Sequence, residues 1–168
     1  FGGRAFCMFS VIFRIIMWDI DDIWEVPMPE LSASTVVPMY YESIGSGMPV
    51  VFIHPPHMDH IVFHYQRELA EHVRVILYDI RGHGRSGTDA EVPTMSRLAA
   101  DLRDLLDEMA VDEAVLCGYS SGASVAQAFA LAYPERTKAL ILSGGFPRVN
   151  TWILKNEFRA GMALVKAG

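Results

Sequence analysis

The segment from Val115 to Glu135, "VLCGYSSGASVAQAFALAYPE", constrains the fold most. Its first residues form a short apolar run that predicts a buried strand, and residues 121–133 predict a helix of small residues that Pro134 stops. The five residues "GYSSG", 118–122, lie between the two. A strand that turns into a helix so abruptly needs glycine, because a side chain two positions either side of the turn would collide with neighbouring backbone. The segment therefore predicts a tight turn that lifts the hydroxyl of Ser120 off the strand end.

The remainder of the chain alternates strand and helix patterns. Residues 50–53, 73–80, 113–119 and 138–144 are short apolar runs, as expected of strands buried on both faces of a sheet. Residues 35–44 predict a further strand with Pro38 near an edge, and 45–47 a turn. Helices are predicted over 61–72 and, most clearly, over 94–109, where apolar residues repeat at helical spacing. This alternation predicts an α/β fold with a mostly parallel sheet and helices on both faces.

Composition limits the class of partner. The 168 residues suffice for one domain with a hydrophobic core, and 51% apolar against 20% charged residues indicates a globular chain. The net charge is −6 and no basic block occurs, so neither nucleic acid nor a membrane is an expected partner. Cys7 and Cys117 show no disulfide or metal spacing, which favours a reduced, cytoplasmic location.

The two ends differ from the middle of the chain. Residues 5–18 are the most apolar run, but they are too short to span a bilayer and Arg14 interrupts them. A signal-peptide core is a second interpretation, although no small-residue cleavage site follows. We expect residues 1–27 to be an upstream extension outside the fold, 28–150 to form the N-terminal part of the core, and 151–168 to begin a helical lid.

Three motifs in this order resemble the α/β-hydrolase superfamily: "VVFIHPP" at 50–56, "DIRGHGRSG" at 79–87 and "GYSSG" at 118–122. "YPERTKALIL" at 133–142 is also similar to that family, and the resemblance covers roughly residues 35–150. It implies the α/β-hydrolase fold, ending here after its sixth strand and the start of its lid. It also implies that Ser120 is a nucleophile that attacks a small-molecule acyl substrate, that the backbone N–H of Ser121 is an oxyanion donor, and that no cofactor takes part.

The second oxyanion donor departs from the family pattern. The family usually has His-Gly after the first buried strand, followed by a residue whose N–H points into the site. This chain has His54-Pro55-Pro56-His57, and proline has no N–H. We expect the N–H of His57, the first after the prolines, to replace it; the alternative is a weak or altered oxyanion hole.

The triad partners of Ser120 are missing from the sequence. In this family the acid and then the histidine follow the serine. Residues 121–168 contain no histidine and no aspartate, and their only carboxylates are Glu135 and Glu157. The acid and base of the triad are therefore absent from this chain, and we expect little or no hydrolysis from it and an aggregation-prone last strand.

Two other groups of polar residues invite a functional interpretation. The loop "DIRGHGRS" offers Asp79, His83 and Ser86, but the resemblance implies a structural loop. Four histidines, at 54, 57, 60 and 64, suggest a metal site, but no acidic residue stands at ligand spacing, so we expect no metal. We expect His54 to be a buried loop anchor and the other three to be partly exposed near the site.

The function predicted from the sequence is that of a serine hydrolase acting on an ester or similar acyl compound. One alternative is a non-catalytic binding or signalling protein on the same fold. Another is a different activity on the scaffold, such as a C–C hydrolase, acyl transferase or lyase. The fold alone does not choose among them.

Overall fold

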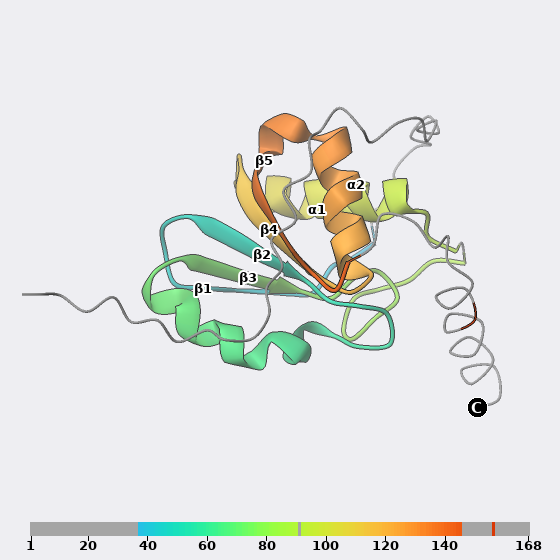
Figure 1. The fold of residues 1–168 in the computed structure, drawn as a ribbon. Coiled ribbons are helices and arrows are strands. Elements are labelled where there is room, and N and C mark those ends of the chain that lie inside the picture. The colour runs from blue at the N-terminus through green and yellow to red at the C-terminus, as the bar shows by residue number, and fades with distance from the viewer. Residues whose placement is uncertain (1–36, 91, 146–155, 157–168) are drawn as a thin grey trace, which may run out of the picture.

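The structure, a computed structural model, describes residues 37–90, 92–145 and 156 (Figure 1). The predicted extension, 1–27, and all of the predicted lid except residue 156 lie outside these residues. Within the described part, five strands occur: β1 (Tyr41–Ile44), β2 (Pro49–Ile53), β3 (Arg74–Tyr78), β4 (Ala114–Tyr119) and β5 (Thr137–Ser143). The resemblance implied six, and five lie among the described residues.

The strands form one sheet in the order β1-β3-β2-β4-β5. β1 pairs with β3 in antiparallel fashion, and the other three pairings are parallel. The predicted mostly parallel sheet is thus confirmed. Ile53 at the end of β2 pairs with Gly118 near the end of β4. The loops that follow β2, β3 and β4 therefore leave the sheet at one edge.

The connections between strands are helical. α1 (Met95–Glu108) and α2 (Gly122–Ala132) are α-helices, whereas η2 (His60–Glu71) and the short η3 (Pro134–Arg136) are 3-10 helices. The helix predicted over 61–72 therefore exists, but with tighter winding and a kink at Phe63, where φ is −100° and ψ is 25°. The side chain of Asp59 opens η2 by accepting a hydrogen bond from the N–H of Ile61.

Helices cover both faces of the sheet, as predicted: α1 and α2 lie on one side and η2 on the other (Figure 1). Along β2 the side chains alternate between two cores. Val51 and Ile53 pack on the side of α1 and α2, while Phe52 packs against Phe63 of η2 with ring centroids 5.2 Å apart. Because both faces are covered, β2 reads in the sequence as an unbroken apolar run.

Two strands are shorter than the sequence predicted, because their outer residues form other hydrogen bonds. Residues 37–40 precede β1, and there the N–H of Tyr40 donates to the Oγ of Ser86 while the carbonyl of Pro38 accepts from the N–H of Gly87. β3 ends at Tyr78, and two residues later the N–H of Ile80 donates to the ring of His54 instead of to a strand. Both shortened strand ends lie at the edge of the sheet where the loops after β2, β3 and β4 begin.

A buried ion pair fastens the loop after β3 to α1. The side chain of Arg81 is 1% exposed, and its Nε and Nη2 donate to the two carboxylate oxygens of Asp101 at 2.7 and 2.6 Å. Its Nη1 donates to Asp89 at 2.5 Å. This bidentate geometry is the kind that stabilises a buried guanidinium.

Replacing Asp101 with asparagine should lower the free energy of unfolding by about 2 kcal/mol, because the amide presents an N–H₂ to a buried guanidinium. Urea titration followed by circular dichroism measures the change. The matched control is Asp104→Asn in the more exposed Arg103–Asp104 pair, which should cost less than about 1 kcal/mol. Equal losses for the two variants would contradict the role given to the Arg81 pair.

Candidate active site

Ser120 sits at the junction of β4 and α2 in a conformation that non-glycine residues rarely adopt. Its φ is +54°, in the left-handed region. Its N–H donates to the carbonyl of Ser143 at 2.7 Å, and its own carbonyl accepts from the N–H of Ala123 at 3.0 Å. The β5 end and the first turn of α2 therefore hold the strained backbone in place.

The two glycines around Ser120 are required by close backbone contacts. A Cβ on Gly118 would lie 2.4 Å from the Cα of Ala123, and a Cβ on Gly122 would lie 2.1 Å from the carbonyl oxygen of Ile53. Both contacts are far inside van der Waals distance, and both are with backbone. The steric reason that the sequence suggested for these glycines is confirmed.

Ser121 is the N-cap residue of α2, directly beside Ser120. The first N–H groups of a helix have no partner inside it, and the helix dipole is positive there. The Ser121 side chain makes no capping bond, and its buried Oγ has no hydrogen-bond partner among the described residues. Ser121 thus adjoins the predicted nucleophile at the helix end best suited to an oxyanion.

His57 shares an unusual backbone with Ser120. Among the described residues, only three non-glycine residues have positive φ: His57 (62°), Ala110 (50°) and Ser120 (54°). His57 is exposed. It lines an open pocket together with Met58 and His83. Ser120 is not among the residues that line this pocket. The structure places His57 and Ser120 in loops that leave the sheet at the same edge, after β2 and β4.

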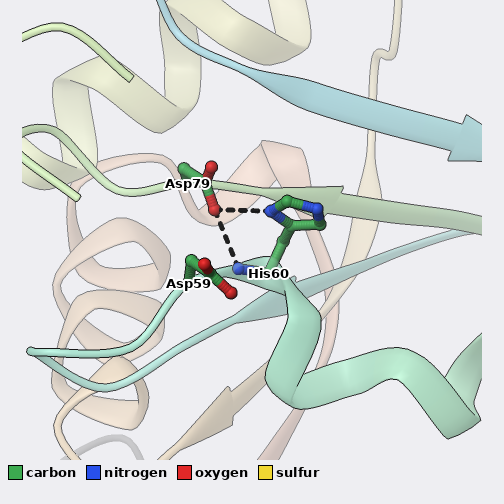
Figure 2. A group of neighbouring side chains, drawn as sticks. All are labelled: Asp59, His60 and Asp79. Carbon is green, nitrogen blue, oxygen red and sulfur yellow. Dashed lines mark hydrogen bonds and ion pairs between the residues drawn. The ribbon is translucent and has the colours of Figure 1, made fainter. Parts of the chain in front are cut away.

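The carboxylate of Asp79, fully buried, joins three segments of the chain, and Figure 2 shows its two hydrogen bonds to His60. Its Oδ1 accepts from the N–H and the ring Nδ1 of His60 at 2.8 and 2.7 Å, and its Oδ2 accepts from the N–H of Arg85 at 2.9 Å. Burial by itself would raise the pKa of Asp79, but these hydrogen bonds outweigh it and hold the pKa below its usual 3.8. Asp79 is therefore an ionised structural anchor.

The other polar side chains of the 79–87 loop also bind protein groups. The Oγ of Ser86 donates to the Asp79 carbonyl at 2.6 Å and accepts from the N–H of Tyr40 at 2.8 Å. The Nδ1 of His83 lies 3.0 Å from the Arg81 carbonyl. The residues that look like a triad in the sequence therefore brace the loop and one another, as the family resemblance implied.

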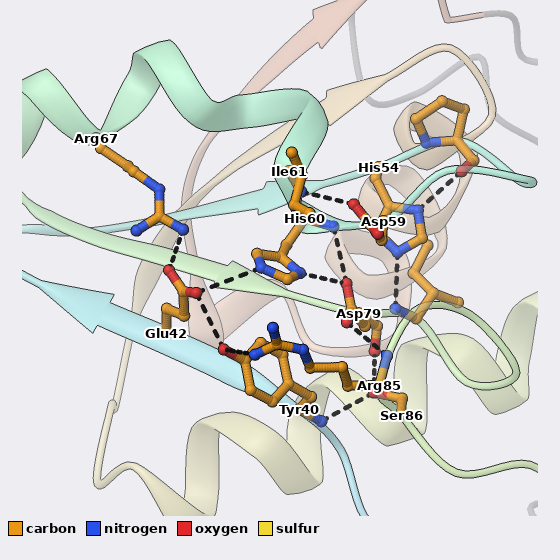
Figure 3. Close-up of polar contacts among 12 residues, drawn as sticks. Tyr40, Glu42, His54, Asp59, His60, Ile61, Arg67, Asp79, Arg85 and Ser86 are labelled. Atoms are coloured by element: carbon orange, nitrogen blue, oxygen red, sulfur yellow. Dashed lines mark hydrogen bonds and ion pairs between the residues drawn. The ribbon is translucent and has the colours of Figure 1, made fainter.

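The histidines divide differently from the prediction (Figure 3). His54 is fully buried, and His57 and His64 are exposed, in line with expectation. The prediction for His60 was wrong: it is 3% exposed. Its ring lies between Asp79 and Glu42, with Nε2 3.3 Å from the Glu42 carboxylate, and packs on Tyr40. Those partners are 18 to 20 residues away, so no local pattern could have revealed them.

Asp59, His60 and Asp79 bring three possible metal-ligand atoms within 4.8 Å of one another. These atoms already serve the protein. Asp79 Oδ1 accepts two hydrogen bonds from His60, and the Asp59 side chain caps η2. The hydrogen bonds of this cluster connect the start of η2 to the residue that follows β3.

In the part of the chain that the structure describes, every helix is too short or too polar to cross a membrane.

Known proteins provide close comparisons. Residues 58–166 match the family described as serine aminopeptidase, S33. A putative carbamate hydrolase, RutD, from Azorhizobium caulinodans is 33% identical over 116 residues, which cover 68% of this chain and 44% of the relative. Epoxide hydrolase 2 from Siraitia grosvenorii is 34% identical over 113 residues, covering 61% and 34%.

Solved structures give the same result. A thermophilic esterase from Thermogutta terrifontis superposes with a TM-score of 0.68 at 35% identity, covering 74% of this chain and 46% of the esterase. The chain thus spans less than half the length of each of these three relatives. The fold, the braced strand-to-helix turn at Ser120 and the family match agree, and the chain belongs to the α/β-hydrolase superfamily, in the family described as serine aminopeptidase, S33.

Proposed function

We propose that Ser120 is the nucleophile of a serine hydrolase that acts on an ester or a similar acyl compound through an acyl-enzyme. The observation that carries this proposal is the left-handed backbone of Ser120, φ +54°, between two glycines that leave no room for a Cβ. Such a conformation costs about 1–3 kcal/mol and persists where the surroundings impose it, most often at functional sites. Two of the three relatives named above, a carbamate hydrolase and an esterase, act by name on acyl compounds and support this substrate class, whereas the third is named an epoxide hydrolase.

In the proposed reaction the Oγ of Ser120 attacks the acyl carbon, and a base takes the hydroxyl proton. The carbonyl oxygen becomes an oxyanion that accepts from the N–H of Ser121 and from a second N–H on the loop after β2, which we assign to His57. The leaving group departs with the proton, and water then releases the acyl group.

The acid and the base that this reaction needs do not follow Ser120 in these 168 residues. A serine without a base is a weak nucleophile at neutral pH. We therefore propose that this chain alone has little or no hydrolytic activity. Because its two cysteines show no disulfide spacing, we also propose a cytoplasmic location.

Labelling with a fluorophosphonate, mapped by peptide mass spectrometry, tests the proposal on the chain itself. We expect little labelling in buffer alone and an increase of about tenfold at Ser120 when imidazole is added as a substitute base. Ser120→Ala should abolish the adduct, and Ser124→Ala, one turn along α2, should leave it unchanged.

Two results would count against the proposal. Equal labelling of Ser120 and Ser124 would show that the turn confers no special reactivity, which favours a non-catalytic binding protein on this fold. Ester hydrolysis by the chain alone that disappears in Ser120→Ala would contradict the proposed inactivity.

A further inference from the structure

We propose that His54 is the positioning residue for the second oxyanion donor: its ring ties the loop of residues 54–59 to Ile80 and thereby fixes the N–H of His57. This inference rests on the function proposed above, which requires a donor from that loop. It assigns a role to a buried histidine that lies outside any triad.

The hydrogen bonds of His54 define one form of its ring (Figure 3). The N–H of Ile80 donates to Nε2 at 2.9 Å, so Nε2 carries no proton. Nδ1, 2.8 Å from the carbonyl of Pro55, then carries the proton and donates to that carbonyl. The neutral ring, 0% exposed, thus connects Pro55, at the start of the 54–59 loop, to Ile80, two residues after β3.

The far end of the same loop is tied to Asp79, the residue before Ile80 and the first after β3. The N–H and the ring Nδ1 of His60 both donate to the buried carboxylate of Asp79. The segment 55–59 is therefore held at both ends by the consecutive residues Asp79 and Ile80. It cannot slide along the sheet edge without breaking a buried hydrogen bond, which is costly. His57, with φ +62°, lies at the middle of this segment.

The tie depends on the charge state of His54. Protonation of Nε2 would place an N–H against the N–H of Ile80 and break the bond. Burial above all, helped by the ring of His83 with its centroid 5.4 Å away, lowers the pKa of His54 below its ordinary 6.5. The hydrogen bond to the Pro55 carbonyl and, more weakly, the carboxylates of Asp79 and Asp59 raise the pKa and do not reverse this. The tie is therefore complete above pH 6.5 and is lost as the pH falls through the lowered pKa.

NMR on this chain tests the inference through amide exchange at Ile80 and backbone order at His57. In His54→Phe, which has no acceptor, we expect exchange at Ile80 to accelerate about tenfold or more and the order of His57 and Met58 to fall. Amides of β4 should keep their protection. His54→Gln, whose side-chain oxygen can accept from Ile80 and does not titrate, should restore protection and remove the acid loss seen in the wild type. His64→Phe, an exposed histidine on η2, is the matched control and should change neither signal.

The outcomes separate cleanly. An ordered His57 in His54→Phe, with or without faster exchange at Ile80, overturns the inference. If His54→Phe fails to fold, the pH profile decides: loss of His57 order in acid in the wild type but not in His54→Gln supports it, and identical profiles overturn it. None of these readouts depends on Ser120, so failure here leaves the proposed hydrolase intact, and failed labelling of Ser120 leaves the His54 tie intact.

Discussion

Replacing Gly122 with alanine should lower the free energy of unfolding by about 4 kcal/mol or more, the largest effect that we expect from one methyl group in this chain. The new Cβ would lie 2.1 Å from the carbonyl oxygen of Ile53 and 2.9 Å from that of His54. Both obstacles are backbone at the end of β2, so no side-chain rotation relieves the clash. The first turn of α2 must move away from the sheet and take Ser121 with it. Urea unfolding followed by far-UV circular dichroism measures the loss.

Gly144→Ala is the matched control for this prediction. Gly144, unlike Gly122, adopts a left-handed conformation, with φ +64°, and no atom of the described residues, its chain neighbours aside, lies within 4 Å of where its Cβ would be. Its replacement should cost only the backbone penalty of about 1 kcal/mol. Similar losses at Gly122 and Gly144 would mean that α2 is not pressed against β2 as the structure has it.

Asp79→Ala should cost about 4 kcal/mol, because it leaves three donors without their acceptor: the N–H groups of His60 and Arg85 and the ring of His60. Asp79→Asn should cost less, since an amide oxygen still accepts. The control is Asp59→Ala on the same loop, where only the cap of η2 is lost, at about 1 kcal/mol. An Asp79→Ala variant as stable as Asp59→Ala would contradict the central role of Asp79.

The same carboxylate predicts part of the pH dependence of stability. Its pKa is lower in the folded state than the usual 3.8, so the unfolded chain takes up a proton first as the pH falls. The contribution of Asp79 to stability is complete above pH 3.8 and is lost below it, through the lowered pKa. Unfolding titrations of the wild type and Asp79→Asn between neutral and acid pH should converge in this range.

The sequence predicted the strand-to-helix turn at Ser120 well because its cause is local. A strand, a glycine two residues before the serine, a glycine two residues after it and a helix of small residues leave one steric solution. The structure has this solution, with Ser120 left-handed and both glycines against backbone. The buried strands were predicted for a similar reason, since covering both faces of a sheet requires continuous apolar runs.

The sequence failed where the deciding partner was distant. His60 was expected to be partly exposed, yet its ring is buried between Glu42 of β1 and Asp79, which directly follows β3. Residues 37–40 were expected in a strand, yet they bind the loop after β3 through the N–H of Tyr40 to Ser86 and the N–H of Gly87 to the Pro38 carbonyl. Helix η2 was expected to be an ordinary helix, and hydropathy cannot distinguish a 3-10 helix from an α-helix over so few turns.

The sequence by itself thus determined the α/β class, the strand-to-helix turn and the serine at its tip, because spacing and sterics within a few residues control these features. Only the tertiary structure decided how the loops at the sheet edge are held. His54, His60, Asp79 and Ile80 meet there through hydrogen bonds between residues 19 to 26 positions apart. Such bonds depend on the sheet order that brings β2 beside β3, and that order becomes visible only once the chain has folded.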